Sequence, residues 1–231
     1  MVTRSEPLPQ GAEKARAVQT MFDRIAPRYD LVNRVMTFGL DVRWRRRVVA
    51  SLGLSPGSLV LDIACGTGDL CRELHSQGLR AVGFDFSNGM LAAARTDAPL
   101  VQADALALPV TDGSADGITC GFALRNVVDI RQLLSEFRRV LRPGGRLGIL
   151  EVAEPSSSLL RFGHRVYFRR VVPFVGALLS DRDAYRYLPQ STAYLPPRPE
   201  LVRILNAAGL ADARSQLLSF GAAQLLTGTK A

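Results

Sequence analysis

Acidic residues and glycines recur at the ends of three successive apolar runs of the chain. Asp62 lies in the first run and the loop Gly66-Thr67-Gly68 follows it, Asp85 ends the second run, and Asp104-Ala105 follows the third. Glycines let the backbone approach a ligand closely, and a carboxylate at a strand end can accept hydrogen bonds from both hydroxyls of a ribose. A carboxylate and a backbone N–H after the third run suit the edge of an adenine. The spacing therefore indicates one site for a ligand that contains ribose and adenine.

The glycine loop differs from the loops that hold phosphates. It has neither the Gly-x-Gly-x-x-Gly spacing of dinucleotide sites nor the Gly-Lys-Ser/Thr of triphosphate sites. Taken singly, each residue also has a structural explanation: Asp62 and Asp85 as helix caps, Gly66 and Gly68 as a tight turn, and Asp104 as a solvated loop residue. We interpret them as one site because they occur at three successive strand ends.

The elements that must position these residues alternate between strand and helix patterns. Strands are predicted at 58–63, 80–84, 100–102, 117–122 and 146–150, with helices over 69–77, from Ser87 and over 130–141. After residue 197, a helix at 200–208 and β-like runs at 213–218 and 222–227 follow. Such alternation with short connections predicts an α/β fold, with a parallel sheet that is covered on both faces.

Two helical segments lie outside this alternation. We therefore expect a single domain with four parts: an N-terminal helical cap (1–57), the core (58–154), an insertion (155–197) and a C-terminal helix with strands (198–231). Ligands of open α/β sheets bind beyond the carboxyl ends of the strands. A helical lid built from the cap and the insertion would then cover the site.

Composition narrows the class of protein. The chain has 231 residues, of which 47% are hydrophobic and 22% charged, which is typical of a soluble globular protein. No apolar stretch approaches the ~20 residues that a membrane-spanning helix needs, and the N-terminus lacks the apolar region of a signal peptide, so we expect a cytoplasmic location. Its cysteines, Cys65, Cys71 and Cys120, have no metal-ligand spacing, so we expect neither a structural disulfide nor a metal site.

The strand-end residues resemble the motifs of class I methyltransferases that bind S-adenosylmethionine. Over nearly its whole length the chain also resembles a narrower family, the C-methyltransferases of menaquinone and ubiquinone biosynthesis. The stretches that carry this resemblance are 29–39, 61–69, 85–91, 122–127 and 183–188. The resemblance implies a Rossmann-like fold with a seven-stranded, mostly parallel sheet. It also implies that the glycine loop holds the methionine part of the cofactor, the acidic residue the ribose and the Asp-Ala pair the adenine.

The same resemblance implies transfer of a methyl group to a ring carbon of a reduced, prenylated quinone. We favour demethylmenaquinol, with a ubiquinone precursor as the alternative. A soluble phenol also stays open, because the sequence departs from the family pattern. Gly121, in the cofactor region, stands where the family has serine, Ala123 where it has glycine, and Leu226 and Thr229 where it has histidine and tyrosine.

Further site residues are implied by the resemblance. Arg125 would face the reacting ring, and Asn126 would orient a water there or contact the cofactor. Because the pKa of arginine is too high for a base near pH 7, we assign Arg125 to stabilising the phenolate or to holding a water that takes the proton. The alternative is that Arg125 pairs with a surface carboxylate. The ring pocket would be lined by Tyr29, Asn33, Met36, Tyr185 and Tyr187.

The excess of positive charge, +8 in total, lies mainly in the N-terminal cap and the insertion. In the insertion, Arg161, Arg165 and Arg169 share one face of a predicted amphipathic helix that ends near Pro173, and segment 43–47 surrounds Trp44 with arginines. We expect peripheral contact with an anionic membrane through 43–47 and 159–172, with a lid helix packed on the sheet as the alternative.

Two other functions must be compared with quinone methylation. A nucleic-acid methyltransferase would also suit a basic surface, but its Asp/Asn-Pro-Pro-Tyr/Phe motif is missing after the fourth strand, so no nucleic acid is expected. A binding protein that kept only the fold is disfavoured by the intact Gly66, Gly68 and Asp85. The pattern leaves the oligomeric state open, a homodimer included.

Overall fold

A mixed sheet forms the centre of the molecule. The computed structural model describes residues 10–155 and 157–231, and only the backbone of several residues between 165 and 188, Tyr185 among them. The seven strands of the sheet are β1 (Leu59–Ile63), β2 (Arg80–Asp85), β3 (Leu100–Gln102), β4 (Ala115–Gly121), β5 (Leu141–Val152), β6 (Leu210–Leu218) and β7 (Ala223–Lys230). Their order is β3-β2-β1-β4-β5-β7-β6, and only β7 runs antiparallel to its neighbours. The expected seven-stranded, mostly parallel sheet is confirmed.

Helices cover both faces of this sheet. Those that connect its strands are α4 (Asp69–Ser76), α5 (Asn88–Ala92), α6 (Ile130–Val140) and α10 (Arg198–Ala207). Two of them begin at side-chain caps: Ser87 Oγ accepts from Met90 N (3.1 Å), and Asp129 Oδ1 accepts from Arg131 N (2.8 Å). Such caps satisfy N–H groups that have no partner inside the helix. The start of α5 follows its local sequence signal, whereas β5 begins at Leu141 and β6 at Leu210, before their predicted starts at 146 and 213.

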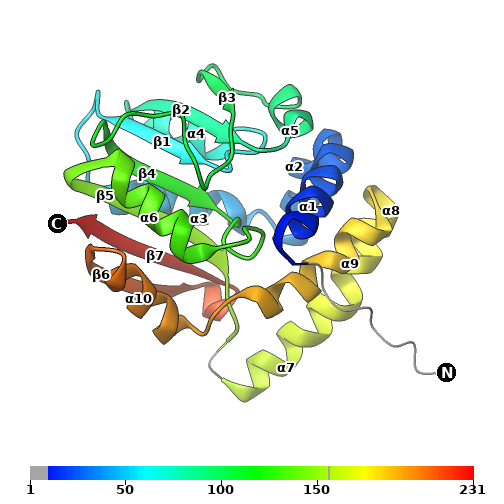
Figure 1. Ribbon diagram of the computed structural model, residues 1–231. Helices are drawn as coiled ribbons and strands as arrows, with labels where there is room; N and C mark the ends of the chain where they lie inside the picture. Colours follow the sequence, from blue (N-terminus) through cyan, green and yellow to red (C-terminus); the bar gives the residue numbers. More distant parts are fainter. Residues whose placement is uncertain (1–9, 156) are drawn as a thin grey trace.

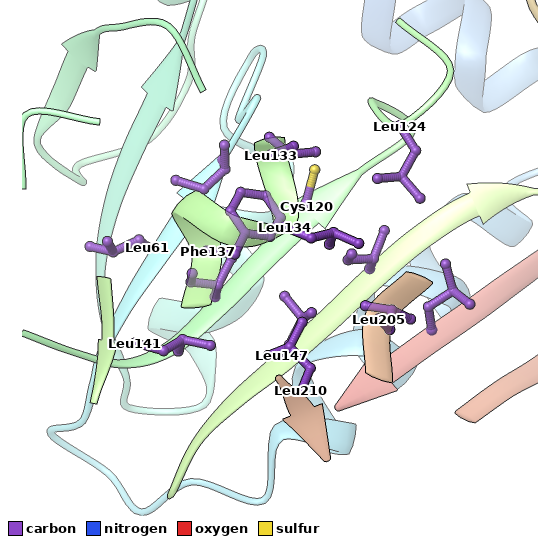
Figure 2. Close-up of a cluster of buried hydrophobic side chains, with 14 of the residues drawn as sticks. Leu61, Cys120, Leu124, Leu133, Leu134, Phe137, Leu141, Leu147, Leu205 and Leu210 are labelled. Atoms are coloured by element: carbon purple, nitrogen blue, oxygen red, sulfur yellow. The ribbon is translucent and has the colours of Figure 1, made fainter. Parts of the chain in front are cut away.

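The core has a layer on each side of the sheet. Figure 2 shows one layer, in which Leu133, Leu134 and Phe137 of α6 pack with Leu147 of β5 and Leu205 of α10. The opposite layer is built by α3 (Leu40–Leu52) and α4. Because both faces are covered, β1 reads as a nearly continuous apolar run rather than an alternating one.

The cap and the insertion pack together. The cap comprises α1 (Gly11–Ile25), a 3-10 turn (Ala26–Arg28), α2 (Tyr29–Met36) and α3. The insertion comprises α7 (Ser158–Val166), a π-helical turn (Tyr167–Val171), α8 (Val172–Leu179), α9 (Arg182–Ser191) and a 3-10 turn (Thr192–Tyr194). Figure 1 shows α1, α2, α8 and α9 grouped at one end of the sheet. A separate apolar cluster joins them, with Met21, Val32, Met90, Val172 and Ala184 among its members.

The helix expected to end near Pro173 continues beyond it. Pro173 lies in the first turn of α8, a position where the missing N–H of proline is tolerated. On the expected basic face, Arg161 is exposed, whereas the side chains of Arg165 and Arg169 lie outside the described residues. Within 10–155 and 157–231, no helix combines the length and the apolar character needed to cross a bilayer.

The expected interfacial position of Trp44 is wrong. Trp44, Val48 and Leu52 recur every four residues of α3 and are buried against the sheet. The indole is anchored there, because its Nε1 donates to Ser219 Oγ (2.8 Å). Segment 43–47 therefore offers no aromatic side chain to a membrane.

Arg45 of the same segment is also turned inward. It is buried, pairs with Asp41, and its Nη2 lies 2.9 Å from Asp69 Oδ2. Arg45 is buried because it lies next to Trp44 on the inward side of the helix. The carboxylates of Asp41 and Asp69 compensate the charge of its guanidinium. Arg43, Arg46 and Arg47 are exposed, so the basic surface of segment 43–47 consists of these three.

Candidate active site

A cavity of about 150 Å³ lies beyond the carboxyl ends of β1 to β4. Of the residues predicted from the sequence, it is lined by Tyr29, Gly66, Asp85, Asp104, Ala105, Gly121 and Asn126. Helix α1 closes one side through Ala15, Val18, Gln19 and Phe22. The structure thus brings together residues from all three strand ends that the sequence singled out, and adds a wall from the cap.

Asp85 joins the first and second strand ends. Its Oδ2 accepts from Gly66 N (2.7 Å), and its Oδ1 accepts from Ser87 N (2.8 Å). Burial raises the pKa of Asp85, and these backbone N–H groups partly oppose that rise. Each carboxylate oxygen can accept a second hydrogen bond. Asp85 therefore fixes the glycine loop and still offers acceptors to a ligand in the cavity.

Thr67 and Gly68 shape the loop without lining the cavity. Thr67 donates its hydroxyl to Asp30 of α2. Gly68 has φ +84°, and a Cβ there would lie 2.6 Å from Thr96 Cγ2, so only glycine fits. The loop is also a tight turn, because Gly68 N donates to Cys65 O (2.9 Å).

Asp62 is fully buried and does not line the cavity. Its Oδ1 accepts from Thr119 Oγ1 (2.8 Å), and its Oδ2 accepts from Cys71 Sγ (3.4 Å). Both donors are side chains and not the backbone N–H groups at a helix start. Asp62 is therefore not a helix cap, and that alternative is wrong. Burial raises the pKa of Asp62 to about 7, despite the hydrogen bonds from Thr119 and Cys71.

Asp104 follows β3 and is exposed at the mouth of the cavity. Its Oδ1 accepts from Leu106 N (2.9 Å), which holds the loop after β3 in a turn. Ala105, next to it, lines the same wall. A backbone amide and a carboxylate are thus available side by side.

Arg125 lies behind the cavity in a buried ion pair. Its Nη1 contacts the fully buried carboxylate of Glu151 and donates to Phe122 O (2.8 Å). Its backbone N also donates to Glu151 Oε2 (3.3 Å). The alternative of a surface carboxylate as partner is therefore wrong. Among the described residues, Arg125 Nε is buried and has no hydrogen-bond partner.

Other buried polar atoms nearby also lack partners. Asn126 Oδ1 and Tyr187 OH have none among the residues that the structure describes. Burial raises the pKa of Tyr187 to about 12, and it raises that of Tyr29 against a hydrogen bond from Asn33. The charge of Arg125 acts on both phenols. Buried polar atoms without partners are rare in proteins and point to a ligand.

The remaining predicted pocket residues lie elsewhere. Met36 is buried in the apolar cluster between cap and insertion, and Tyr187 packs against the same cluster. Neither lines the cavity. The side chain of Tyr185 lies outside the described residues.

Sequence reasoning missed two charged residues. Glu151 ends the apolar run of β5, so the strand-end pattern that identified Asp85 could have found it. Lys14 donates to Val127 O (2.7 Å), and its Nζ lies 3.7 Å from the ring centroid of Tyr194. Burial lowers the pKa of Lys14 to about 8. No local pattern pointed to Lys14, because its partners are distant in sequence.

Helix α1 also clamps the loop after β2. Asp23 Oδ1 accepts from Ser87 Oγ (2.5 Å) and from Gly89 N (2.8 Å). Gln19 Nε2 donates to Phe86 O (3.0 Å). A Cβ on Gly89 would lie 2.7 Å from Asp23 Cα, so the close approach of the helix requires glycine there.

Comparison with known proteins places this chain in a family. Residues 10–230 match the ubiE/COQ5 methyltransferase family. The demethylmenaquinone methyltransferase of Roseiflexus castenholzii is 47% identical, covering 96% of this chain and 97% of the relative. The demethylmenaquinone methyltransferase of Thermus thermophilus is 44% identical, and the match covers 91% of this chain and 100% of the relative. The ubiquinone/menaquinone biosynthesis C-methyltransferase UbiE of Geobacter sulfurreducens is 41% identical, covering 94% and 90%.

Solved structures agree on the fold. A SAM-dependent methyltransferase of Thermotoga maritima, described as a possible histamine N-methyltransferase, superposes with a TM-score of 0.65 at 21% identity over 93% of this chain and 100% of that chain. The phosphoethanolamine N-methyltransferase 2 of Haemonchus contortus, in complex with S-adenosyl-L-methionine, superposes with a TM-score of 0.57 at 21% identity. The superposition covers 76% of this chain and 38% of that chain. The fold is that of the class I methyltransferases, and the chain belongs to the ubiE/COQ5 methyltransferase family.

Proposed function

We propose that the chain transfers the methyl group of S-adenosylmethionine to a ring carbon of demethylmenaquinol. The observation that carries this proposal is the arrangement of the site: a cavity at four parallel strand ends, backed by buried polar atoms that lack partners. Relatives at 44–47% identity that are named demethylmenaquinone methyltransferase support the substrate. The relative named UbiE favours a ubiquinone precursor as the second candidate.

The residues of the cavity fit S-adenosylmethionine. Asp85 would accept from the ribose hydroxyls, since both of its oxygens keep an unused lone pair. Asp104 and Ala105 would meet the adenine edge, and Gly66 and Gly121 would let the methionine part lie against backbone. Asp62, Thr67 and Gly68 would act by holding the glycine loop in shape. The cofactor supplies the electrophilic methyl group.

Arg125 and Asn126 would act on the quinol oxygens. A ring carbon becomes a good nucleophile when the adjacent hydroxyl loses its proton, because the negative charge spreads onto that carbon. The free Nε–H of Arg125 would donate to this developing phenolate, and the free Oδ1 of Asn126 would accept from a quinol hydroxyl or from a water that takes the proton. Donors fixed in a buried site stabilise such charge strongly. Tyr29, Met36, Tyr185 and Tyr187 would enclose the ring.

The cap (1–57) and the insertion (155–197) would together form the lid of a single domain. Contacts between distant segments support this: Lys14 of α1 reaches Val127 after β4 and the ring of Tyr194 in the insertion. A closed lid excludes water from the reacting groups. It also keeps the ring carbon aligned with the methyl group, which can supply up to ~7–11 kcal/mol of the barrier.

The substrate places the reaction at a membrane. A prenylated quinol resides in the bilayer, so we propose that the chain works in the cytoplasm with peripheral contact to the inner face of the cell membrane. The exposed arginines of segment 43–47 and the segment 159–172 are the predicted contacts. No nucleic acid takes part in the proposed reaction.

Incubation with labelled S-adenosylmethionine and reduced quinones tests the proposal. Demethylmenaquinol with a short prenyl tail should be methylated on carbon, and faster than a ubiquinone precursor analogue or a panel of soluble phenols. Product mass and position of the label are the readouts. Faster methylation of a soluble phenol, or transfer to oxygen, would overturn the substrate assignment.

A further inference from the structure

Helix α2 carries apolar side chains on two opposite faces. Its inner face is conventional: Val32 and Met36 are 0% and 8% exposed. On its outer side Leu31, Val35 and Phe38 are 58%, 44% and 81% exposed. Their spacing of four and three residues forms one stripe along the helix and its C-terminal turn. A surface helix normally places polar residues there, so the stripe needs an explanation outside folding.

Phe38 strengthens this conclusion. It adopts φ +52°, a left-handed conformation that is unfavourable for a bulky residue. Backbone strain of this kind is commonly linked to function. The Phe38 ring lies 6.1 Å from the ring of Tyr167, whose hydroxyl donates to Met36 O (2.5 Å). The stripe is therefore held in place by the insertion.

Exposed apolar side chains continue on the insertion. Helix α2 packs against α8, and both lie at the same end of the molecule (Figure 1). Exposed apolar residues of α7 to α8 include Leu159, Phe162, Val166, Val171 and Phe174. Exposed apolar surface gathered in this way marks a protein or membrane contact.

The charges around the stripe distinguish a membrane from a protein partner. Arg28 and Arg34 flank it and are exposed, with Arg34 Nε 3.3 Å from Asp41 Oδ2, and Arg161 and Arg170 of the insertion are exposed as well. The carboxylates of α2 and α3 are instead turned inward: Asp30 binds Thr67, and the buried Asp41 pairs with arginines. An apolar stripe with a cationic border matches the interface of an anionic bilayer.

We propose that Leu31, Val35 and Phe38 insert into the interfacial region of an anionic lipid bilayer. Arg28 and Arg34 would then lie at the level of the lipid headgroups. The opposite side of the same helix carries Tyr29, which lines the cavity. Docking through the stripe would thus place the site directly above the bilayer. This benefit rests on the proposed function, because only a lipid-borne substrate gains from it.

Co-sedimentation of the full chain with vesicles tests the stripe. The vesicles contain either phosphatidylcholine alone or an equal mixture with phosphatidylglycerol. Phe38→Ser should lower partitioning into the anionic vesicles about tenfold, since an interfacial phenylalanine side chain is lost. The comparison variant is Phe220→Ser: Phe220 is 86% exposed, with φ +58°, but lies in the turn between β6 and β7, where its neighbours contact Trp44 and Pro155. Arg28→Glu should reduce binding to the anionic vesicles only.

Several outcomes would overturn the proposal. It fails if Phe38→Ser binds like the wild type, or if Phe220→Ser loses as much binding, which would indicate general surface hydrophobicity. A change of sedimentation mass in Phe38→Ser without vesicles would identify a contact between copies of the chain instead. Methylation of a tail-less soluble quinol separates the two proposals, because Phe38→Ser should leave it unchanged. If no quinol is methylated but the stripe still governs vesicle binding, only the proposed function fails.

Discussion

The two halves of the candidate site are built in different ways. Asp85 on the cofactor side has both carboxylate oxygens on backbone N–H groups of nearby loops. Arg125 on the substrate side is held by Glu151 of another strand, and its Nε has no partner among the described residues. In the Asp85 half, backbone N–H groups already hold the carboxylate in place. The Arg125 half keeps buried polar atoms unsatisfied, which is costly unless a ligand pairs with them.

The largest expected effect is on the cofactor half. Asp85→Ala removes the carboxylate at the end of β2 and releases the glycine loop. Loss of two charge-assisted hydrogen bonds costs about 3–6 kcal/mol, so affinity for S-adenosylmethionine should fall at least ~100-fold. Isothermal titration calorimetry measures this. Asp112→Ala, at a carboxylate that is 78% exposed and remote from the cavity, is the control and should bind like the wild type.

Arg125→Lys tests the substrate half. The ammonium still compensates Glu151, but the Nε–H donor is lost. We expect kcat to fall about 100-fold, as when one donor to a developing oxyanion is removed, while calorimetry shows unchanged cofactor binding. A thermal unfolding curve close to that of the wild type is the control for folding. Normal turnover would mean that Arg125 only holds Glu151.

The glycine loop allows a sharper comparison within the cofactor half. Gly57 (φ +85°) and Gly68 (φ +84°) are both left-handed, but a Cβ at Gly57 meets nothing within 4 Å. Gly57→Ala should cost about 1–2 kcal/mol of unfolding free energy from backbone strain alone. Gly68→Ala should cost about 1–3 kcal/mol more, because of the clash with Thr96. Urea denaturation measures both, and equal costs would show that the loop can relax.

A pH dependence is expected at Lys14, which joins the lid to the core. Because burial lowers its pKa from 10.5 to about 8, the unfolded chain binds more protons between these values. Stability should therefore rise with pH from about 8 to 10.5, relative to Lys14→Met. Urea denaturation across this range measures the slope, with Lys230→Met as the matched lysine control. A flat difference would indicate that the contact with Tyr194 keeps the ammonium charged.

The geometry of the half that we propose for the cofactor was predictable because its signals are local. Strand, loop and helix follow one another within residues 58–92, and Asp85 closes on a glycine loop only 19 residues away. Ser87 was expected as a helix cap and is one. A search for an acidic residue at the end of the apolar run of β5 would also have found Glu151.

The substrate half was less predictable because distant segments build it. Lys14 and Val127 are 113 residues apart, and no sequence period connects them. Trp44 was misplaced for a related reason. The arginines around it hid a four-residue apolar repeat, and which side of α3 meets the sheet is decided by tertiary packing.

Helix α1 is at once a wall of the cavity and the clamp on the loop that follows Asp85. Asp23 couples the two, because a displacement of α1 breaks its contacts with Ser87 and Gly89. The position of the loop that follows Asp85 therefore depends on how the N-terminal helix is seated.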